Sequence, residues 1–459
     1  MMFPPLRFLT VNAIVVFICG PTIVHAWCRN QPGDPGYPSV ADWSTFNDTI
    51  SGRLLSIVPS AEACRELSCT EAQWKSGIFR QTIPGSMNAY NWEQDYGPPP
   101  QLCLRNGSDC AQGNVPLFAA GIRFAQVHSL RVVIKSSGHD YLGRSTAKNS
   151  LLLWTAFLKN ITFTDQFSIA GVDHGPAVTV GSGVGLKTLY VAAKAQDKMF
   201  IGGTAATVSP AGGYTQGAGH SAFSPLYGLA ADNVLQFNVV LADWLPLFWA
   251  MRGGGAGSWG VIIDATFPTL PIFNVTLHTV NVLTATLDQT DCLMATHAMH
   301  INDWDDVGAG QYFYLTGSKS NSTLVLSTLF KDLDGEASKS QMSSFLADVT
   351  ALGAVVQGES TVTTSRLVPS TVYTHPPKSV GSAYRQLLSQ DVQSVLGHLV
   401  AGGRVAVNAK IDSAVIATKR WDSTLSAEAV QALRLDFTAT VRPVLEELAG
   451  GASSGSYSN

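Results

Sequence analysis

His139 is the residue whose type and setting point most directly to chemistry. It follows Ser136, Ser137 and Gly138, and these small residues come directly after the β-branched apolar run 132–134. Such a run predicts a short buried strand, and small residues let the backbone after it come close to a ligand. We therefore expect His139 at the tip of a turn that faces a ligand, although a lone histidine there is more often an ordinary loop residue.

Two stretches rich in small residues are suited to holding phosphates. Consecutive backbone N–H groups in such turns form concavities that bind anions. Residues 135–139 can form one concavity, and residues 212–220, GGYTQGAGH, can form another. A flexible loop is the alternative for the second stretch, but its length and order disfavour that interpretation. Asp232 suits a turn and a cofactor contact equally, and Arg252 could pair with an acid or a phosphate.

Three other motifs carry less weight. Residues 181–185, GSGVG, imitate a dinucleotide fingerprint, but Leu186 occupies the place of its third glycine, so we expect a tight turn instead. Residues 451–455, GASSG, fit a hydrolase elbow, yet no strand leads into them and no histidine follows. His297 and His300 could bind a metal at i, i+3, although satisfied surface histidines are the commoner case.

The order of the motifs gives a family resemblance. The chain contains, in sequence, SSGHDYLGRST, LLLWT, AGGYTQGAGHS, YGLAADNVL and FWAMRGGGAGSWGV. This series resembles the berberine-bridge-enzyme-like flavin oxidases, whose FAD domain is of the p-cresol-methylhydroxylase (PCMH) type. The likeness is greatest to secreted fungal FAD-linked oxidoreductases, and it covers most of the chain after the first two dozen residues. It implies FAD as the cofactor, with the imidazole of His139 joined to the 8α-methyl group of the flavin.

The resemblance also assigns residues to the site. Many relatives have a second flavin link through a cysteine, but Ala205 occupies that position here, so one link at most is expected. A tyrosine near the C-terminus lies close to the flavin in this family, which makes Tyr457 a candidate for the catalytic base. The expected cofactor-binding residues are Lys135, Ser136, Ser137, Gly138, His139, Asp140, Tyr141, Gly212, Gly213, Gln216, Gly217, Gly219, His220, Gly228, Asp232 and Val261.

By resemblance, the protein is a secreted FAD-dependent oxidoreductase that acts on a small organic substrate in fungal secondary metabolism. The substrate would pass a hydride to flavin N5 while a base takes a proton, and O2 would reoxidise the flavin. An alcohol, a sugar or a metabolite undergoing oxidative ring closure would each suit this reaction. The alternative is a catalytically impaired secreted glycoprotein on the same fold.

Composition and targeting features agree with secretion. Of 459 residues, 46% are hydrophobic and 14% are charged, which suits a folded protein with a large core. A net charge of −4 without a basic run disfavours nucleic acid or a membrane as partner. Residues 1–26 have the pattern of a signal peptide, and their apolar segment is too short for an anchor. Glycosylation sequons, each weak alone, stand at Asn47, Asn106, Asn160, Asn274 and Asn321.

The cysteines also suggest an oxidising compartment. Cys19 falls in the signal segment, and Cys292 stands apart from the others. Five cysteines cluster before residue 111, so we expect disulfides in the N-terminal region with a pairing that the sequence leaves open. The five are Cys28, Cys64, Cys69, Cys103 and Cys110.

We expect an α+β fold in several parts. Residues 27–112 would be a Cys/Pro-rich lead-in with short helices, and residues 113–271 a two-part PCMH-type FAD-binding domain. Residues 272–425 would form a substrate (cap) domain, whose β–α–β–β–α order predicts an antiparallel sheet with helices on one side. Residues 426–459 would form a return helix that is apparently truncated. The periodicity predicts helices over 114–131, 186–196 and 291–300, and strands over 131–135, 178–180, 235–242 and 260–267.

The chain also departs from the family pattern. After Leu117 and after Asp243 it lacks strand-forming segments that relatives carry, and it stops at Asn459 where relatives continue. Missing strands would leave sheet edges open and backbone groups without partners. These departures raise the expectation of an impaired form or of a mis-spliced gene.

Overall fold

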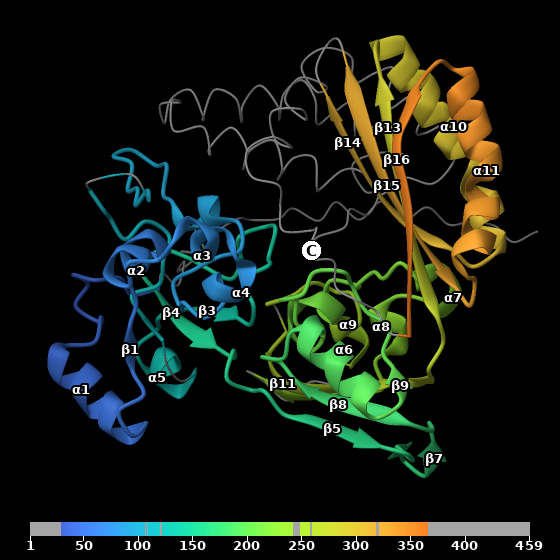
Figure 1. The fold of residues 1–459 in the computed structure, drawn as a ribbon. Helices are drawn as coiled ribbons and strands as arrows, with labels where there is room; N and C mark the ends of the chain where they lie inside the picture. Colours follow the sequence, from blue (N-terminus) through green and yellow to red (C-terminus); the bar gives the residue numbers. More distant parts are fainter. Residues whose placement is uncertain are drawn as a thin grey trace, which may run out of the picture.

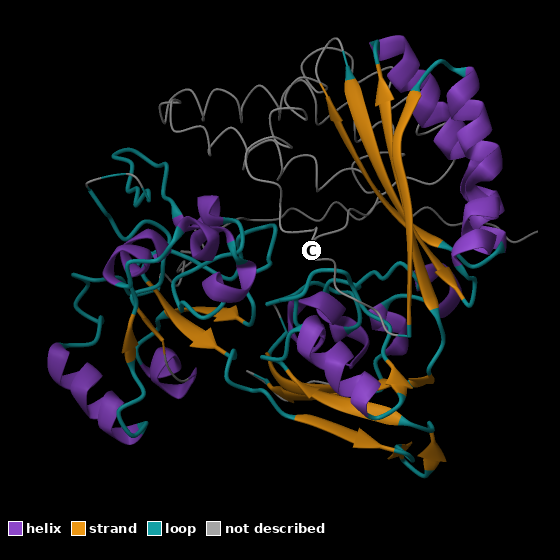
Figure 2. Cartoon of the chain, viewed as in Figure 1, coloured by secondary structure: helices purple, strands orange, loops and turns teal. Residues whose placement is uncertain are grey.

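The computed structural model describes residues 29–105, 107, 109–119, 122–241, 248–257, 259–317 and 321–365. Three four-stranded sheets organise this part of the chain, each with its own helices (Figure 1). Figure 2 shows that helices and strands are mixed along the whole described chain. The expected α+β class is confirmed.

One edge strand of the first sheet leads into the turn that contains His139. Its order is β1 (Leu55–Ser56), β2 (Phe118–Ala119), β4 (Ser150–Trp154) and β3 (Arg131–Lys135). β3 is parallel to β4, and β1 is antiparallel to β2. The lead-in 27–112 therefore supplies an edge strand to this sheet. Val133 and Leu152 pack into a small core beside it.

The lead-in contributes several short helices and two disulfides. The helices are α1 (Val40–Thr49), α2 (Ser60–Glu66), α3 (Glu71–Lys75), α4 (Gly77–Arg80) and the 3₁₀ turn Tyr90–Glu93. Cys64 is bonded to Cys69, and Cys103 to Cys110. The expectation of disulfides in this region is thus confirmed. Cys292 is an exposed free thiol, and Cys28 lies outside the described residues.

The second sheet is antiparallel. Its order is β10 (Gln236–Val240), β11 (Val261–Pro268), β8 (Ala177–Gly181) and β5 (Ile161–Thr164). Helix α6 (Leu186–Ala195) buries Leu186 and Leu189 in the same core as Val178 and Phe267. Smaller elements are β6 (Ser168–Ile169), β7 (Val172–Asp173), β9 (Lys198–Met199), β12 (Leu270–Pro271), the irregular turn Pro210–Tyr214, α7 (Ser224–Tyr227), α8 (Ala230–Asn233) and α9 (Phe248–Met251).

The third sheet is the predicted cap. Its order is β14 (Gly310–Gly317), β15 (Ser322–Lys331), β13 (Val275–Thr284) and β16 (Val355–Thr364), antiparallel throughout. Helices α10 (Leu287–Asp306) and α11 (Gly335–Ala351) cover one face, as Figure 1 shows. Alternate residues of β13, Val280 and Val282, pack against these helices. The predicted antiparallel sheet with helices on one side is confirmed.

One predicted element was wrong in part. The expected helix 114–131 is helical only at α5 (Ile122–Val127), because Phe118 and Ala119 form β2 between β1 and β4. A two-residue strand has no periodicity of its own, and its partners lie far away in the sequence. None of the helices in the described part of the chain combines the length and apolar character that a bilayer crossing requires. The expected return helix of 426–459 lies outside the described residues.

Candidate functional site

The turn after β3 meets a second segment, residues 202–209. The Nε2 atom of His139 lies 2.6 Å from the hydroxyl oxygen of Thr207, which belongs to a buried residue. Gly138 has a φ of 81°, a conformation that favours glycine, and its carbonyl accepts a hydrogen bond from the Asn88 N–H at 2.9 Å. The half-buried imidazole is therefore oriented by the segment 202–209, while the lead-in fixes the backbone beneath it.

The tight turn 181–185 joins these two segments. The carbonyl of Ser182 accepts hydrogen bonds from the hydroxyls of Ser136 and Ser209, the latter at 2.7 Å. A Cβ on Gly183 would lie 2.5 Å from a backbone oxygen, so only glycine fits there. The predicted tight turn is confirmed, and its carbonyl holds the first Gly-rich turn beside the segment with Thr207.

Residues 212–220 lie against the first turn as well. A Cβ on Gly212 would lie 2.8 Å from the Ser136 hydroxyl, so glycine permits the close approach. The buried Gln216 accepts from the Gly255 N–H through its carbonyl at 2.8 Å. The stretch 212–220, which includes Gly213, Gly217 and Gly219, is thereby hydrogen-bonded to the turn that contains Gly255.

Several of the predicted cofactor-binding residues also stabilise the local fold. The carboxylate of Asp140 accepts from the N–H groups of Leu142 and Ser145 at 3.0 and 3.1 Å, which closes the turn after His139. Burial raises the pKa of the neighbouring Tyr141. Val261 is buried at the start of β11.

Asp232 and Arg252 interact with backbone rather than with each other. Asp232 accepts from the Leu229 N–H at 2.8 Å, which caps α8, and Gly228 adopts a φ of 78° just before it. Arg252 donates to the carbonyls of Ala231 and Asp232. Within the described residues, the guanidinium of Arg252 pairs with backbone carbonyls around α8 instead of with an acid, and its pairing with a phosphate stays a prediction.

Lys135 is buried beneath the His139 turn. Its Nζ atom donates to the carbonyls of Ile83, Pro84 and Ser86, at 3.2 Å for Ile83 and 2.8 Å for Ser86. Burial lowers the pKa of Lys135 to about 7, and the nearby Glu93 carboxylate opposes that shift. Lys135 therefore anchors the lead-in to the end of β3 rather than facing a ligand with its charge.

The second Gly-rich stretch reaches the cap at His220. Its Nδ1 atom lies 3.1 Å from the hydroxyl of Tyr312 on β14. The Tyr214 hydroxyl donates to the His220 carbonyl at 2.6 Å, which fixes the end of the loop. The face of the cap sheet that carries no helices is thus joined to the loop expected to hold the cofactor.

The residues present suit an anionic cofactor. The Ser182 hydroxyl is buried and has no hydrogen-bond partner among the described residues. Within the same part of the chain, the backbone N–H groups of Ser137 and Gly138 have no acceptor. Buried polar groups need partners, and such donors at converging small-residue turns fit the phosphates of a nucleotide.

Other predicted sites fare differently. Tyr457 and Asn106 lie outside the described residues. Asn160, Asn274 and Asn321 are exposed, whereas the amide oxygen of the half-buried Asn47 accepts from the Leu54 N–H at 3.0 Å.

The predicted surface position of His297 and His300 was wrong, because α10 packs both against the cap. His297 contacts Gln311 at 3.1 Å, and burial lowers the pKa of this histidine to about 4. His300 contacts Asp303 and Asp348 at 3.1 and 2.9 Å, which links α10 to α11. These contacts support packing between the helices rather than a metal site.

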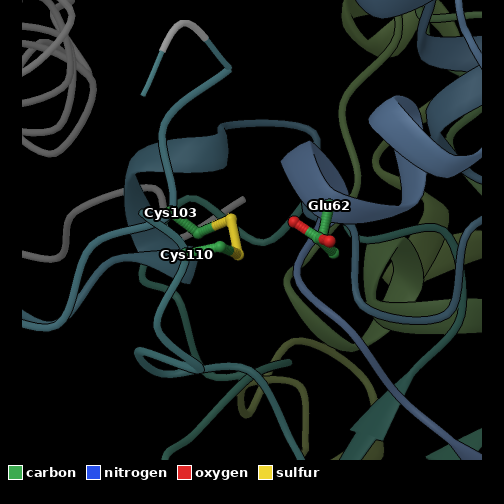
Figure 3. A group of neighbouring side chains, drawn as sticks. All are labelled: Glu62, Cys103 and Cys110. Carbon is green, nitrogen blue, oxygen red and sulfur yellow. A yellow bond between two sulfur atoms is a disulfide. The ribbon is translucent and has the colours of Figure 1, made fainter. Parts of the chain in front are cut away.

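One further group has the spacing of metal ligands in the described residues. Figure 3 shows Glu62 beside the Cys103–Cys110 disulfide. The two sulfurs are bonded to each other, and Glu62 forms an ion pair with Arg65. A disulfide offers no thiolate, so this group serves the lead-in fold.

Sequence reasoning missed the roles of two residues. Thr207 lies in the segment that holds Ala205 in place of the linking cysteine, and Tyr312 was part of a strand pattern. Lys135 was expected among the cofactor-binding residues, and its contacts with the lead-in were not foreseen. Their roles arise from contacts between residues distant in the chain, such as the 68 positions between His139 and Thr207.

Comparison with known proteins supports FAD as the cofactor. A family model described as an FAD binding domain matches residues 117–243. An uncharacterized FAD-linked oxidoreductase of Arthroderma benhamiae is 29% identical over 461 residues, covering 84% of this chain and 78% of the relative. The VAO-type flavoprotein oxidase VAO615 of Thermothelomyces thermophilus is 36% identical over 292 residues, covering 57% of this chain and 50% of the relative. The chain therefore spans about half the length of this second relative.

A solved structure shares the fold. The crystal structure of the VAO-type flavoprotein MtVAO615 from Myceliophthora thermophila C1 matches with a TM-score of 0.72 and 26% identity. The match covers 92% of this chain and 88% of that one. Together with the FAD-binding-domain match, these relatives confirm the resemblance read from the motifs. The chain thus contains an FAD-binding domain and is similar, in sequence and in fold, to the VAO-type flavoproteins and fungal FAD-linked oxidoreductases.

Proposed function

We propose that this protein is a secreted oxidase that holds FAD through a single covalent link at His139. It oxidises a small organic substrate that carries hydroxyl groups, and it uses O2 as the electron acceptor. The observation that carries this proposal is the convergence of the His139 turn, the Thr207 segment and the stretch 212–220. All three lie within the residues matched by the FAD-binding-domain model.

The roles of the protein groups follow from their positions. When bound, FAD accepts a hydride from the substrate and passes the electrons on, while the protein supplies binding and orientation. The N–H groups of Ser137 and Gly138 would bind phosphate oxygens, and the buried Ser182 hydroxyl would complete its hydrogen bonding on the cofactor. Ala205 cannot form a second link, so His139 alone would retain the flavin.

The preference for a hydroxylated substrate rests on the cap sheet. A row of hydroxyl residues crosses all four strands, with Tyr312 opposite Ser327, Ser327 opposite Thr279, and Thr279 opposite Ser360. Directly paired residues share a face, and Val280 next to Thr279 points into the core below the helices. The row therefore lies on the helix-free face, and its end at Tyr312 contacts His220. Hydroxyls in such a row can hydrogen-bond an alcohol or a sugar.

Secretion and the use of O2 have separate support. The two disulfides suit an oxidising compartment, and exposed sequons at Asn160, Asn274 and Asn321 suit glycosylation. The relative VAO615 is named as an oxidase, which favours O2 as the acceptor.

The test is expression of the full chain in a secreting fungal host. The proposal predicts a yellow glycoprotein in the medium whose flavin stays with the polypeptide after denaturation and whose oxidation of alcohols or sugars produces H2O2. Complete release of the flavin on denaturation would contradict the covalent link. Substrate-reduced flavin that yields no peroxide in air would contradict the oxidase assignment, and a colourless folded protein would favour the non-catalytic alternative.

A further inference from the structure

We propose that Thr207 is a positioning residue for the modification of His139, holding the imidazole in the orientation in which it bonds to the flavin. This inference rests on the covalent link proposed above and adds a residue to it. The carrying observation is the 2.6 Å contact between the Thr207 hydroxyl and Nε2 of His139. Neutral imidazole has one N–H and one acceptor nitrogen, so a hydroxyl at Nε2 fixes the direction of the ring and biases its tautomer.

The start of α6 fixes the backbone of Thr207. The Leu186 N–H donates to the Val208 carbonyl at 2.9 Å, and the Lys187 N–H donates to the Ala206 carbonyl at 3.0 Å. The first free N–H groups of a helix commonly bind such acceptors. The first turn of α6 thus binds the carbonyls of the residues on both sides of Thr207, and this fixes the position of the Thr207 hydroxyl.

The lead-in closes the other side of Thr207. A Cβ built on Gly77, the first residue of α4, would lie 3.4 Å from both the Thr207 hydroxyl and the Asn88 amide oxygen. The Asn88 N–H in turn holds the Gly138 carbonyl. The hydroxyl, the imidazole and the turn that carries the imidazole are therefore packed as one unit.

The attachment step needs this orientation. One N–H bond of the imidazole and one C–H bond of the flavin 8α-methyl break, and a C–N bond forms between the ring nitrogen and that carbon. The two protons and two electrons released reduce the flavin, and O2 takes them to give H2O2. Such a reaction between bound groups is sensitive to small misplacements of the attacking atom. Since Ala205 provides no second link, misplacement of His139 is not compensated elsewhere.

The experiment compares wild-type protein with T207V, T207S and H139A, all expressed as the full chain. T207V keeps the shape of the side chain and removes the hydroxyl, whereas T207S keeps the hydroxyl. T204V is the matched control, because Thr204 lies in the same segment and its hydroxyl makes no hydrogen bond within the described residues. Two quantities are measured on purified protein incubated with FAD: the rate at which flavin becomes acid-stable, and the mass of the peptide containing His139.

We expect T207V to attach flavin about tenfold more slowly than wild type, consistent with loss of one orienting hydrogen bond. T207S and T204V should attach flavin at the wild-type rate, and H139A should show no adduct. Non-covalent FAD binding and the unfolding temperature of T207V confirm that it is folded.

The possible failures are distinguishable. Attachment by folded T207V at the wild-type rate would overturn the role of Thr207 and leave the covalent link standing. An unmodified wild-type peptide would overturn both. Equal slowing in T207V and T207S would also overturn the inference, since the hydroxyl would then not be the active feature. If T207V does not fold, T207S decides the question. Attachment of flavin by T207S at the wild-type rate supports the role of the hydroxyl, and a tenfold slower attachment contradicts it.

Discussion

Replacement of Lys135 by methionine tests whether the lead-in is anchored to the flavin-binding turn. The Nζ atom of Lys135 donates to three carbonyls of residues 83–86, and the side chain is buried. Methionine fills a similar volume but provides no donor. The K135M variant would therefore remove the Nζ donor from those carbonyls and weaken the support of the turn that contains His139.

The size of the effect follows from the number of bonds. A typical intramolecular hydrogen bond contributes about 1 kcal/mol net, so loss of the two bonds that a neutral amine can donate gives about 2 kcal/mol of destabilisation. At neutral pH this loss is offset, because burial lowers the pKa of Lys135 to about 7, and keeping the amine neutral below the pKa of an unfolded lysine, about 10.4, costs about 1.4 kcal/mol per pH unit. The comparison is therefore made near pH 10, where the amine is largely neutral in both states. The buried ion pair of Arg80 with Glu93, at 2.7 Å, lies in the same lead-in and remains intact.

The assay is denaturant unfolding of full-length protein, with flavin fluorescence as a second signal for the site. Near pH 10, K135M should lower the free energy of unfolding by about 2 kcal/mol, and the flavin fluorescence should change before the cap unfolds. The control is K187M, which changes an exposed lysine on α6. A K135M protein as stable as K187M would refute the anchoring role.

Three further predictions follow from the same structure. The pKa of Lys135 in the folded protein, about 7, lies below that of an unfolded lysine, about 10.4, so between these values the unfolded chain binds more protons. The stability of wild type relative to K135M should then rise by up to about 1.4 kcal/mol per pH unit from pH 7 towards pH 10; a difference that is flat with pH in denaturant titrations is the contrary result. S209A removes one of two hydroxyls that bind the Ser182 carbonyl and should cost about 1 kcal/mol, with unchanged stability as the contrary outcome in the same titration. Y312F removes the hydroxyl that contacts His220 and should change KM or kcat for a hydroxylated substrate about tenfold at unchanged flavin content, whereas wild-type kinetics would count against a substrate role for this face.

Much of the fold follows from local patterns. The β-branched run before Ser136 predicts β3 with its observed bounds, and the alternation over 275–284 predicts a strand with one buried face. The cap order follows because its elements are long and adjacent in sequence. By contrast, β2 has two residues and exists through pairing with β1 and β4, so no local signal identifies it.

The residues of the site likewise divide into those that the local sequence identifies and those that only the three-dimensional structure identifies. Glycines in sequence mark where backbones approach closely, and His139 stands out at such a turn. The direction of a buried side chain is not encoded locally, however, which is why the anchoring by Lys135 and the partnership of Thr207 emerge only in three dimensions. His297 and His300 show the reverse error, since polar residues on α10 are buried where the helix meets β14 and α11.

The most direct measurement is the mass of the tryptic peptide that spans residues 136–144 and contains His139, taken from protein purified from a secreting host. A peptide that carries the added mass of a flavin, and loses it in H139A, is the predicted result. An unmodified peptide from protein that is nevertheless yellow would show that the flavin is held without this bond.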